Sequence, residues 1–254
     1  MTAENFRACA VLPVYNHPAV LERTVDDLLG SGLPVVLVDD GSDALCRALM
    51  DTIAAGRGQV HLVRRPANGG KGAAVKDGLR AALALGFSHA LQIDADGQHD
   101  TVDVEPFIGI ARRRPRALVA GYPAYDASVP RHRYYARYAT HVWVWINTLS
   151  TRIRDAMCGF RVYPLAEACA LLDRHPMGSR MEFDVEFIVR WQWAGLPLEQ
   201  RQTRVTYPED GISHFRLWRD NVLISGTHAR LFLTMLTRLP TLLARRLRRP
   251  GNAP

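Results

Sequence analysis

The feature that most constrains the fold is an alternation, through the first half of the chain, of short apolar runs with segments of helical pattern. The runs have strand length and are apolar at consecutive positions. Such strands, separated by helices, are typical of a parallel sheet covered on both faces. The sequence therefore predicts an α/β fold with a mostly parallel sheet, whose strands lie in RACAVLPV (7–14), PVVLVDD (34–40), QVHLVRR (59–65), HALQIDAD (89–96) and ALVAGYP (117–123), and whose helices begin near Pro18, Ser42, Gly70 and Val102.

The alternation stops after Gly121. A loop with two prolines leads into an aromatic, basic helical stretch, and later come a helix around 183–194, a strand near 198–206 and a basic helical tail. There is no internal repeat and no low-complexity linker. We expect a main domain over residues 1–215 and a basic amphipathic helical extension over 216–254.

Composition and charge exclude several classes of protein. A chain of 254 residues with 48% hydrophobic residues can bury a sizeable core. The formal net charge of +7 equals the excess of positive charge from Ile212 onward, a segment that contains eight arginines and one aspartate. Because a nucleic-acid-binding protein should also carry a basic patch on its folded body, nucleic acid is not an expected partner.

The cysteines and the N-terminus bear on the compartment. The four cysteines lack metal-ligand spacing and are expected to be small buried residues in a reducing compartment. The first residues lack the pattern of a signal peptide, and no stretch has the roughly 18 uninterrupted apolar residues of a spanning helix. We therefore expect a cytoplasmic protein.

Polar clusters follow three of the predicted strands, where ligands of parallel sheets bind. Within DDGSD, Gly41 can turn the chain and Ser42 can cap the next helix, while Asp39 and Asp40 can accept hydrogen bonds from a base or a ribose. Both roles can hold at once.

The segment NGGKGAA (68–74) indicates phosphate binding, because glycines let backbone amides approach an anion at the start of a helix. It is not a P-loop, since Arg65 and Gly72 stand where that motif needs a glycine and a serine or threonine. No Gly-x-Gly-x-x-Gly follows the first strand, which disfavours a nicotinamide or flavin enzyme. Lys71 is a candidate counter-charge for phosphate.

The segment LQIDADGQHD (91–100) sets three carboxylates directly after an apolar strand. Either the loop is solvated or a cation sits among the acids. An EF-hand would place its glycine sixth, whereas Gly97 is fourth from Asp94. Asp-x-Asp at a strand end can instead hold Mg²⁺ or Mn²⁺ while phosphate oxygens fill other positions.

Taken in order, AVLPVYN, VDDGSD, NGGKGAA, IDADGQHD and DAMCGFRVYP resemble the family 2 glycosyltransferases of GT-A fold, in the branch that includes the dolichyl- and polyprenyl-phosphate sugar synthases. The resemblance covers roughly residues 6 to 215. It implies a nucleotide site lined by Pro13, Tyr15, Asp39, Asp40, Lys71 and Asp94, a metal held by Asp94, Asp96 and Gln98, and a sugar and acceptor region that includes Gly159, Phe160, Arg161 and Arg131.

The resemblance also implies candidate catalytic carboxylates, Asp155, Glu182 and Asp184. Asp155 could orient the sugar or the attacking group, or it could be a buried partner of Arg161 or Arg154. Glu182 and Glu186 share a helix face, so at least one of them could pair with Arg190.

One segment departs from the family pattern. Lipid-phosphate sugar synthases of this type often carry an arginine three residues before the glycine of Gly-x-Ser-Lys, where it meets donor phosphate. The matching segment PEDGISHFR has Pro208 at that place and His214 instead of lysine. Arg216 is a candidate substitute.

The tail THARLFLTMLTRLPTLLARRLRRP has apolar residues at helical spacing, flanked by arginines. One interpretation is a helix packed on the body with a solvated basic end. The other is an interfacial helix on an anionic membrane, kinked or divided at Pro240, so that two short pieces are expected. The apolar positions are Leu231, Phe232, Met235, Leu236, Leu239, Leu242, Leu243 and Leu247, and the arginines are 230, 238, 245, 246, 248 and 249.

The sequence thus predicts an inverting, metal-dependent glycosyltransferase that uses a GDP- or UDP-linked sugar. The acceptor is a lipid or lipid phosphate, reached from the inner face of the membrane by a peripheral protein. Alternatives are a transferase acting on a soluble hydroxyl acceptor, or a non-catalytic nucleotide-binding or membrane-tethering module. A nucleotidyltransferase would want a Gly- and Arg-rich loop after the first strand, which LPVYNHP does not provide.

Overall fold

The computed structural model describes residues 6–124, 131–204 and 217–247, with side chains for 6–124, 138–204 and 218–245. The described chain forms a seven-stranded sheet with the order β3-β2-β1-β4-β6-β5-β7. Neighbouring strands are parallel except at β6, which runs antiparallel to β4 and β5. The predicted mostly parallel sheet is confirmed, with strands β1 (Ala8–Val14), β2 (Val35–Asp39), β3 (Val60–Arg64), β4 (His89–Gln92), β5 (Leu118–Ala124), β6 (Arg161–Pro164) and β7 (Leu198–Arg204).

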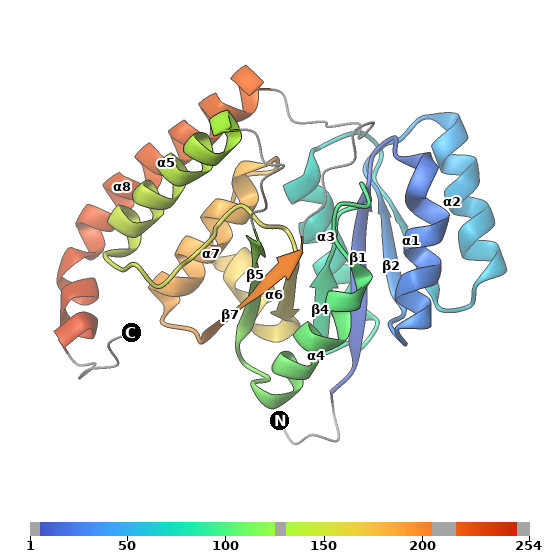
Figure 1. Ribbon diagram of the computed structural model, residues 1–254, viewed down its shortest axis with the longest axis horizontal. Coiled ribbons are helices and arrows are strands. Elements are labelled where there is room, and N and C mark those ends of the chain that lie inside the picture. The colour runs from blue at the N-terminus through green and yellow to red at the C-terminus, as the bar shows by residue number, and fades with distance from the viewer. Residues whose placement is uncertain (1–5, 125–130, 205–216, 248–254) are drawn as a thin grey trace.

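Helices cover both faces of this sheet (Figure 1). α1, α2 and α4 share one core cluster with it, and α3, α6 and α7 share the other. The 3₁₀ turn η2 leads into α4. The helices are α1 (Pro18–Gly30), α2 (Ala44–Gly56), α3 (Lys71–Ala84), α4 (Val104–Arg113), α5 (Arg131–Thr148), α6 (Leu165–Arg174), α7 (Glu182–Ala194) and α8 (Leu217–Leu247), and η2 spans Thr101–Asp103.

The continuous apolar runs are explained by these two layers. Along β1, Cys9 and Val11 enter one core cluster, while Ala10 and Leu12 enter the other. Because successive side chains of a strand point to opposite faces, a sheet covered on both sides needs apolar residues at every position. All four cysteines are free and buried, as predicted.

The prediction that Ser42 caps α2 is wrong. Asp43 is the N-cap, and its carboxylate accepts a hydrogen bond from the Cys46 amide at 2.9 Å. Ser42 lies one residue too early, because its own amide donates to Asp39 Oδ1 at 2.8 Å. The helix therefore begins at Ala44.

α8 is one helix that passes through Pro240, so the predicted division into two pieces is wrong. Packing explains the continuity, since Leu231 and Met235 before the proline and Leu242 after it belong to the same core cluster. α8 lies beside α5, at the end of the molecule opposite α1 and α2 (Figure 1), and it also packs on α7. Among the described helices, none is long and apolar enough to cross a membrane.

The helix-on-body interpretation of the tail therefore accounts for most of its apolar residues. Three of its arginines also face α7: Arg230 pairs with Glu186, the Arg238 guanidinium lies 5.4 Å from the Trp193 ring centroid, and Arg245 donates to the Trp193 carbonyl. The side chains of Arg246 and Leu247, and residues 248–254, lie outside the described part. The division at residue 215 stays a prediction, because 205–216 are also outside it.

Candidate active site

The ends of β1 and β2 are tied together at the carboxyl edge of the sheet. Pro13 and Tyr15, predicted for the nucleotide site, lie half-buried at the end of β1. Asn16 follows with a left-handed backbone (φ 53°). Its amide donates to Ser42 Oγ at 3.2 Å, and its Oδ1 accepts from the Asp43 amide at 2.8 Å. This cross-link fixes the two strand ends beside each other.

Asp39 is fully buried and holds the turn after β2. Its Oδ1 accepts the Ser42 amide at 2.8 Å. Its Oδ2 accepts from Arg64 Nη1 at 3.0 Å and lies 3.3 Å from Arg47 Nε. Both carboxylate oxygens thus have partners within the protein, so the role of Asp39 is to stabilise the turn on which the site is built.

Asp40 holds the glycine loop that precedes α3. Its Oδ1 accepts the Gly69 amide at 2.9 Å, its Oδ2 accepts the Gly70 amide at 2.8 Å, and Arg65 pairs with the same carboxylate. The amides of Gly69 and Gly70, which the sequence suggested for phosphate, therefore point to a carboxylate of the protein. Gly41 must be a glycine here, because it has φ +75° and a Cβ would lie 2.5 Å from the Asn68 nitrogen.

Lys71 begins α3 and lies between two carboxylates. Its Nζ donates to Asp94 Oδ2 at 2.7 Å and lies 3.3 Å from Asp184 Oδ2 on α7. Burial lowers the pKa of Lys71, but Asp184 and Asp94 raise it more, so the net direction is upward and the ammonium keeps its charge. The side chain is 14% exposed. A cation is thus fixed at the N-terminus of a helix, where an anionic ligand is favoured.

Gly159 covers this cation closely. A Cβ at residue 159 would lie 2.5 Å from Lys71 Nζ and 3.0 Å from both Asp94 Oδ2 and Gln92 Nε2. Gln92 itself is buried at the end of β4, where its Oε1 accepts from Tyr163 at 2.7 Å and its Nε2 donates to Asp184 at 3.4 Å. The predicted sugar region therefore does meet the predicted phosphate region.

Phe160 and Arg161 support the site with fully buried side chains. Phe160 packs edge-on against Phe107, with ring centroids 4.7 Å apart. The Arg161 guanidinium donates to the carbonyls of Cys158 at 2.9 Å, Ala156 at 2.7 Å and Asp184 at 2.8 Å. Arg161 therefore joins the 155–159 turn to α7.

Asp94 and Asp96 lie on the loop after β4. Asp94 Oδ1 is buried and, within the described part of the chain, has no hydrogen-bond partner. Asp96 Oδ1 accepts the Gln98 amide at 3.1 Å. Burial and the charge of Asp94 raise the pKa of Asp96 to about 6. Burial also raises the pKa of Asp94, but Lys71 outweighs it and the net direction is downward.

An orphaned carboxylate oxygen beside a crowded second carboxylate fits a divalent cation, which would supply the missing positive charge. The two residues do not make a complete shell, because no group of three or more His, Cys, Asp or Glu side chains gathers for a metal among the described residues. Gln98 and oxygens of a ligand would have to supply the other positions, as Mg²⁺ commonly allows.

The described contacts of Asp155 are with backbone amides and a histidine. Its Oδ1 accepts the amides of Met157 at 2.8 Å and Cys158 at 2.6 Å, and its Oδ2 lies 3.1 Å from His141 Nε2. Asp155 is 1% exposed. The described contacts make it the residue that shapes the turn leading to Gly159.

The two carboxylates expected to share a face of α7 both accept hydrogen bonds, although the buried Oε2 of Glu182 has no partner among the described residues. Glu186 pairs with Arg190 at 2.7 Å, which confirms one of the predicted pairings. Glu182 Oε1 accepts the amides of Ser179 at 3.0 Å and Arg180 at 3.2 Å. Asp184 is the carboxylate of this helix that lies beside Lys71.

Several predicted residues lie outside the described part of the chain. They are the side chain of Arg131, whose backbone begins α5, and the segment with Pro208, His214 and Arg216. Sequence patterns also missed three residues that organise the site, namely Asn16, Gln92 and His141. Of these, only Asn16 gives a local signal, because asparagine directly after a strand tolerates a left-handed backbone.

Residues 9–178 match the profile of glycosyl transferase family 2. The chain belongs to this family. The match includes the Asp39–Asp40 turn, the Lys71 loop, Asp94, Asp96 and Gly159, so the residues brought together at the sheet edge are those of a glycosyltransferase domain. The enzyme class predicted from the sequence is confirmed.

Relatives of this glycosyltransferase include an uncharacterized protein of Methanocaldococcus jannaschii, 28% identical over 81% of the chain and 90% of the relative. A dolichyl-phosphate beta-glucosyltransferase of Trichomonas vaginalis is 24% identical over 75% of the chain and 62% of its own length. The polyprenol monophosphomannose synthase of Mycolicibacterium smegmatis is 31% identical over 46% and 49%. The chain thus spans less than two thirds of each named enzyme. The names confirm the resemblance to the polyprenyl-phosphate sugar synthase branch.

Solved structures show the same fold. The glucosyl-3-phosphoglycerate synthase of Mycobacterium tuberculosis, in complex with Mn²⁺, UDP-glucose and phosphoglyceric acid, aligns with a TM-score of 0.67 and 16% identity over 92% of this chain and 81% of that one. S. aureus TarS (residues 1–349) aligns at 0.54 and 15% identity, over 92% and 71%. The glycosyltransferase has the GT-A fold.

Proposed function

We propose that the chain transfers a sugar from a nucleoside diphosphate sugar, GDP- or UDP-linked, to a lipid phosphate at a membrane surface, with inversion at the anomeric carbon. The observation that carries the donor half is the buried Lys71 ammonium, held at the N-terminus of α3 between Asp94 and Asp184 and covered by Gly159. Its charge and position suit the leaving diphosphate, whose negative charge grows as the glycosidic bond breaks.

Asp94, Asp96 and Gln98 would hold Mg²⁺ or Mn²⁺ at this site. When bound, the cation supplies Lewis-acid stabilisation of the diphosphate. The orphaned Asp94 Oδ1 and the raised pKa of Asp96 support this assignment. Asp39 and Asp40 then act in nucleotide binding by fixing the turn after β2 and the loop before Lys71, beside Pro13 and Tyr15.

The state of the candidate bases favours a phosphate acceptor over a hydroxyl. A hydroxyl acceptor needs a general base, whereas a lipid phosphate arrives already anionic. Asp155 accepts two amides and faces His141, Glu182 accepts two amides, and Asp184 lies beside Lys71. We therefore assign these three carboxylates to positioning: Asp155 shapes the turn to Gly159, Asp184 holds Lys71, and Glu182 holds the segment before α7.

An exposed apolar surface on α8 and α5 supports a lipid acceptor. On α8 it consists of residues that recur at spacings of four, eleven, three and seven, all close to whole helical turns. They lie on one side of the helix, and Trp218 and Leu233 are 83% and 64% exposed. The surface comprises Trp218, Val222, Leu233, Leu236 and Leu243 of α8 and Tyr138, Val142, Trp143 and Ile146 of α5.

Such a surface fits the interfacial region of a bilayer, where tryptophan and leucine side chains are favoured. An enzyme seated in this way reaches a lipid phosphate without a spanning helix. We propose a cytoplasmic protein, peripheral on the inner face of the membrane, with the basic tail drawn to anionic headgroups.

The test is a transfer assay on the full chain with Mn²⁺ or Mg²⁺, a panel of UDP- and GDP-sugars, and polyprenyl phosphate in anionic vesicles. We expect a glycosylated lipid phosphate from one donor, and no product with Asp96→Asn. Vesicles that lack polyprenyl phosphate, and vesicles with the free polyprenol, are the matched controls. Transfer to the free alcohol or to a soluble acceptor alone would refute the phosphate assignment.

A further inference from the structure

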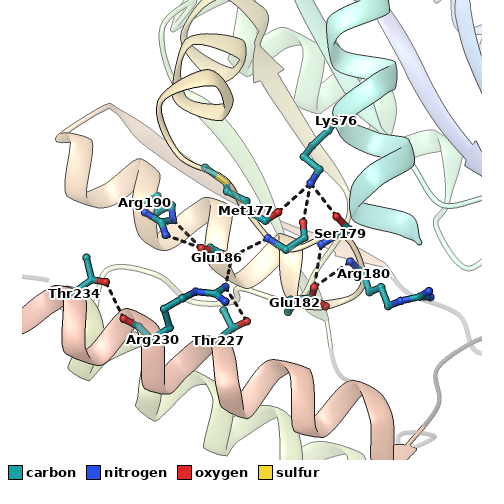
Figure 2. Close-up of polar contacts among 11 residues, drawn as sticks. Lys76, Met177, Ser179, Arg180, Glu182, Glu186, Arg190, Thr227, Arg230 and Thr234 are labelled. Carbon is teal, nitrogen blue, oxygen red and sulfur yellow. Dashed lines mark hydrogen bonds and ion pairs between the residues drawn. The ribbon is translucent and has the colours of Figure 1, made fainter. Parts of the chain in front are cut away.

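Glu186 on α7 is a fully buried carboxylate whose partners come from three parts of the chain (Figure 2). Its Oε1 accepts from Arg190 Nε and Nη2 at 2.9 and 2.7 Å. Its Oε2 accepts from the Gly178 amide and from Arg230 Nη2 of α8, both at 2.9 Å. Arg230 and the 177–180 segment therefore share one oxygen atom.

The 177–180 segment is held from two other directions. Lys76 Nζ of α3 donates to two carbonyls and one hydroxyl of this segment, at 3.0, 3.1 and 3.2 Å (Figure 2). Glu182 Oε1 accepts the amides of Ser179 and Arg180. The segment is thus held by hydrogen bonds with Lys76, Glu182 and Glu186.

This segment packs directly against Gly70 and the first turn of α3, which begins at Lys71. The Ser179 carbonyl accepts the Ala73 amide at 2.9 Å. A Cβ at Gly70 would lie 2.7 Å from that carbonyl oxygen and 2.6 Å from Arg180 Cγ. A shift of the segment therefore disturbs the first turn of α3, because the Ser179–Ala73 hydrogen bond joins the two backbones directly.

We propose that Arg230 and Glu186 are positioning residues for the donor phosphates, so that α8 and the Lys71 loop are coupled. α8 fixes Glu186, Glu186 fixes Gly178, and the 177–180 segment fixes the start of α3. This inference rests on the proposed function for the ligand of Lys71. By linkage, nucleotide binding at the loop must stabilise the seating of α8 to the same extent.

Arg230 is the informative position because it is far more exposed than Arg190, the other guanidinium that binds Glu186. Its side chain is 55% exposed, and Arg190 already pairs with Glu186 through two hydrogen bonds to Oε1. Removing Arg230 leaves Glu186 Oε2 with the Gly178 amide alone and frees the carboxylate to turn toward Arg190. The expected result is a looser 177–180 segment in a folded protein.

The test compares Arg230→Met with Arg238→Met in the full chain. Arg238 is also on α8 and contacts α7, through Trp193 and not Glu186. With Mn²⁺ and UDP or GDP as calorimetric probes, we expect Arg230→Met to weaken nucleotide binding roughly 3- to 30-fold. Arg238→Met should bind as the wild type does, and Arg230→Lys should recover part of the loss. Equal affinities in all variants, or equal losses in both methionine variants, would overturn the coupling.

Hydrogen exchange without ligand separates this inference from the proposed function. Amides of residues 69–73 and 178–180 should exchange faster in Arg230→Met than in the wild type or Arg238→Met. If the wild type binds neither nucleotide, the proposed function fails, but the exchange rates of the three proteins still show whether α8 and the start of α3 are coupled. Unchanged exchange in both segments would overturn it.

Discussion

Replacement of Gly159 by alanine is the sharpest test of the donor site. The new methyl group would lie 2.5 Å from Lys71 Nζ, so the ammonium must retreat by about 1 Å to reach ordinary contact distance. That movement breaks the 2.7 Å hydrogen bond between Lys71 and Asp94. The displaced ammonium would also lose its contact with the donor phosphate, and because a hydrogen bond to a charged group is worth about 1.5–3 kcal/mol, we expect nucleoside diphosphate binding to weaken on the order of 10- to 100-fold.

The lost Lys71–Asp94 bond should also lower stability, but the protein should still fold. The atom that the methyl group meets is the far end of a flexible side chain, and residue 159 does not have a positive φ. Calorimetric titration with Mn²⁺ and UDP or GDP gives the affinity, and thermal unfolding verifies the fold. The matched control is Gly226→Ala on α8, where a Cβ would meet nothing within 4 Å. A folded Gly159→Ala protein with wild-type affinity would show that Lys71 does not bind the donor.

Three other perturbations test separate parts of the structure. Burial raises the pKa of Asp96 to about 6, so the metal-free protein should lose stability as pH rises from about 4 to 6. In urea unfolding with a chelator present, Asp96→Asn should flatten this pH dependence. An unchanged slope would contradict the crowding of the two carboxylates. Asp155→Asn should slow transfer through misplacement of the turn and leave the acidic limb of the pH–rate profile in place, whereas loss of that limb would make Asp155 the general base. The double variant Leu233→Glu and Leu236→Glu changes exposed side chains, so it should keep its melting temperature but no longer sediment with anionic vesicles. Raised salt should weaken vesicle binding of the wild type. If the double variant sediments as the wild type does, α8 is not the lipid contact.

Much of the fold could be predicted because a sheet buried on both faces leaves continuous apolar runs in the sequence. β6 leaves no such run: it has four residues and begins with Arg161, whose charge hides a strand. That arginine is buried because three backbone carbonyls, from residues up to 23 positions away, accept its hydrogen bonds. Such satisfaction by distant groups cannot be read from a local pattern.

The candidate site was predicted in outline for a similar reason. Strand ends and glycine loops are local signals, and they located Asp40, Lys71, Asp94 and Asp96. Which of these residues faces a ligand depends on contacts across the sequence, such as the pairing of Asp40 with amides 29 and 30 residues later. The pairing of Asp155 with His141 crosses from a turn to α5 and had no signal of its own.

The hydrogen bonds between Asp40 and the glycine loop affect the thermodynamics of donor binding. Glycine has more backbone freedom to lose than other residues, and ordering one residue costs about 1–2 kcal/mol. Here Gly69 and Gly70 are already ordered by a carboxylate on one side and by the 177–180 segment on the other. The entropy of the loop is therefore lost during folding, and the free energy of contact with the donor is available for affinity and for transfer.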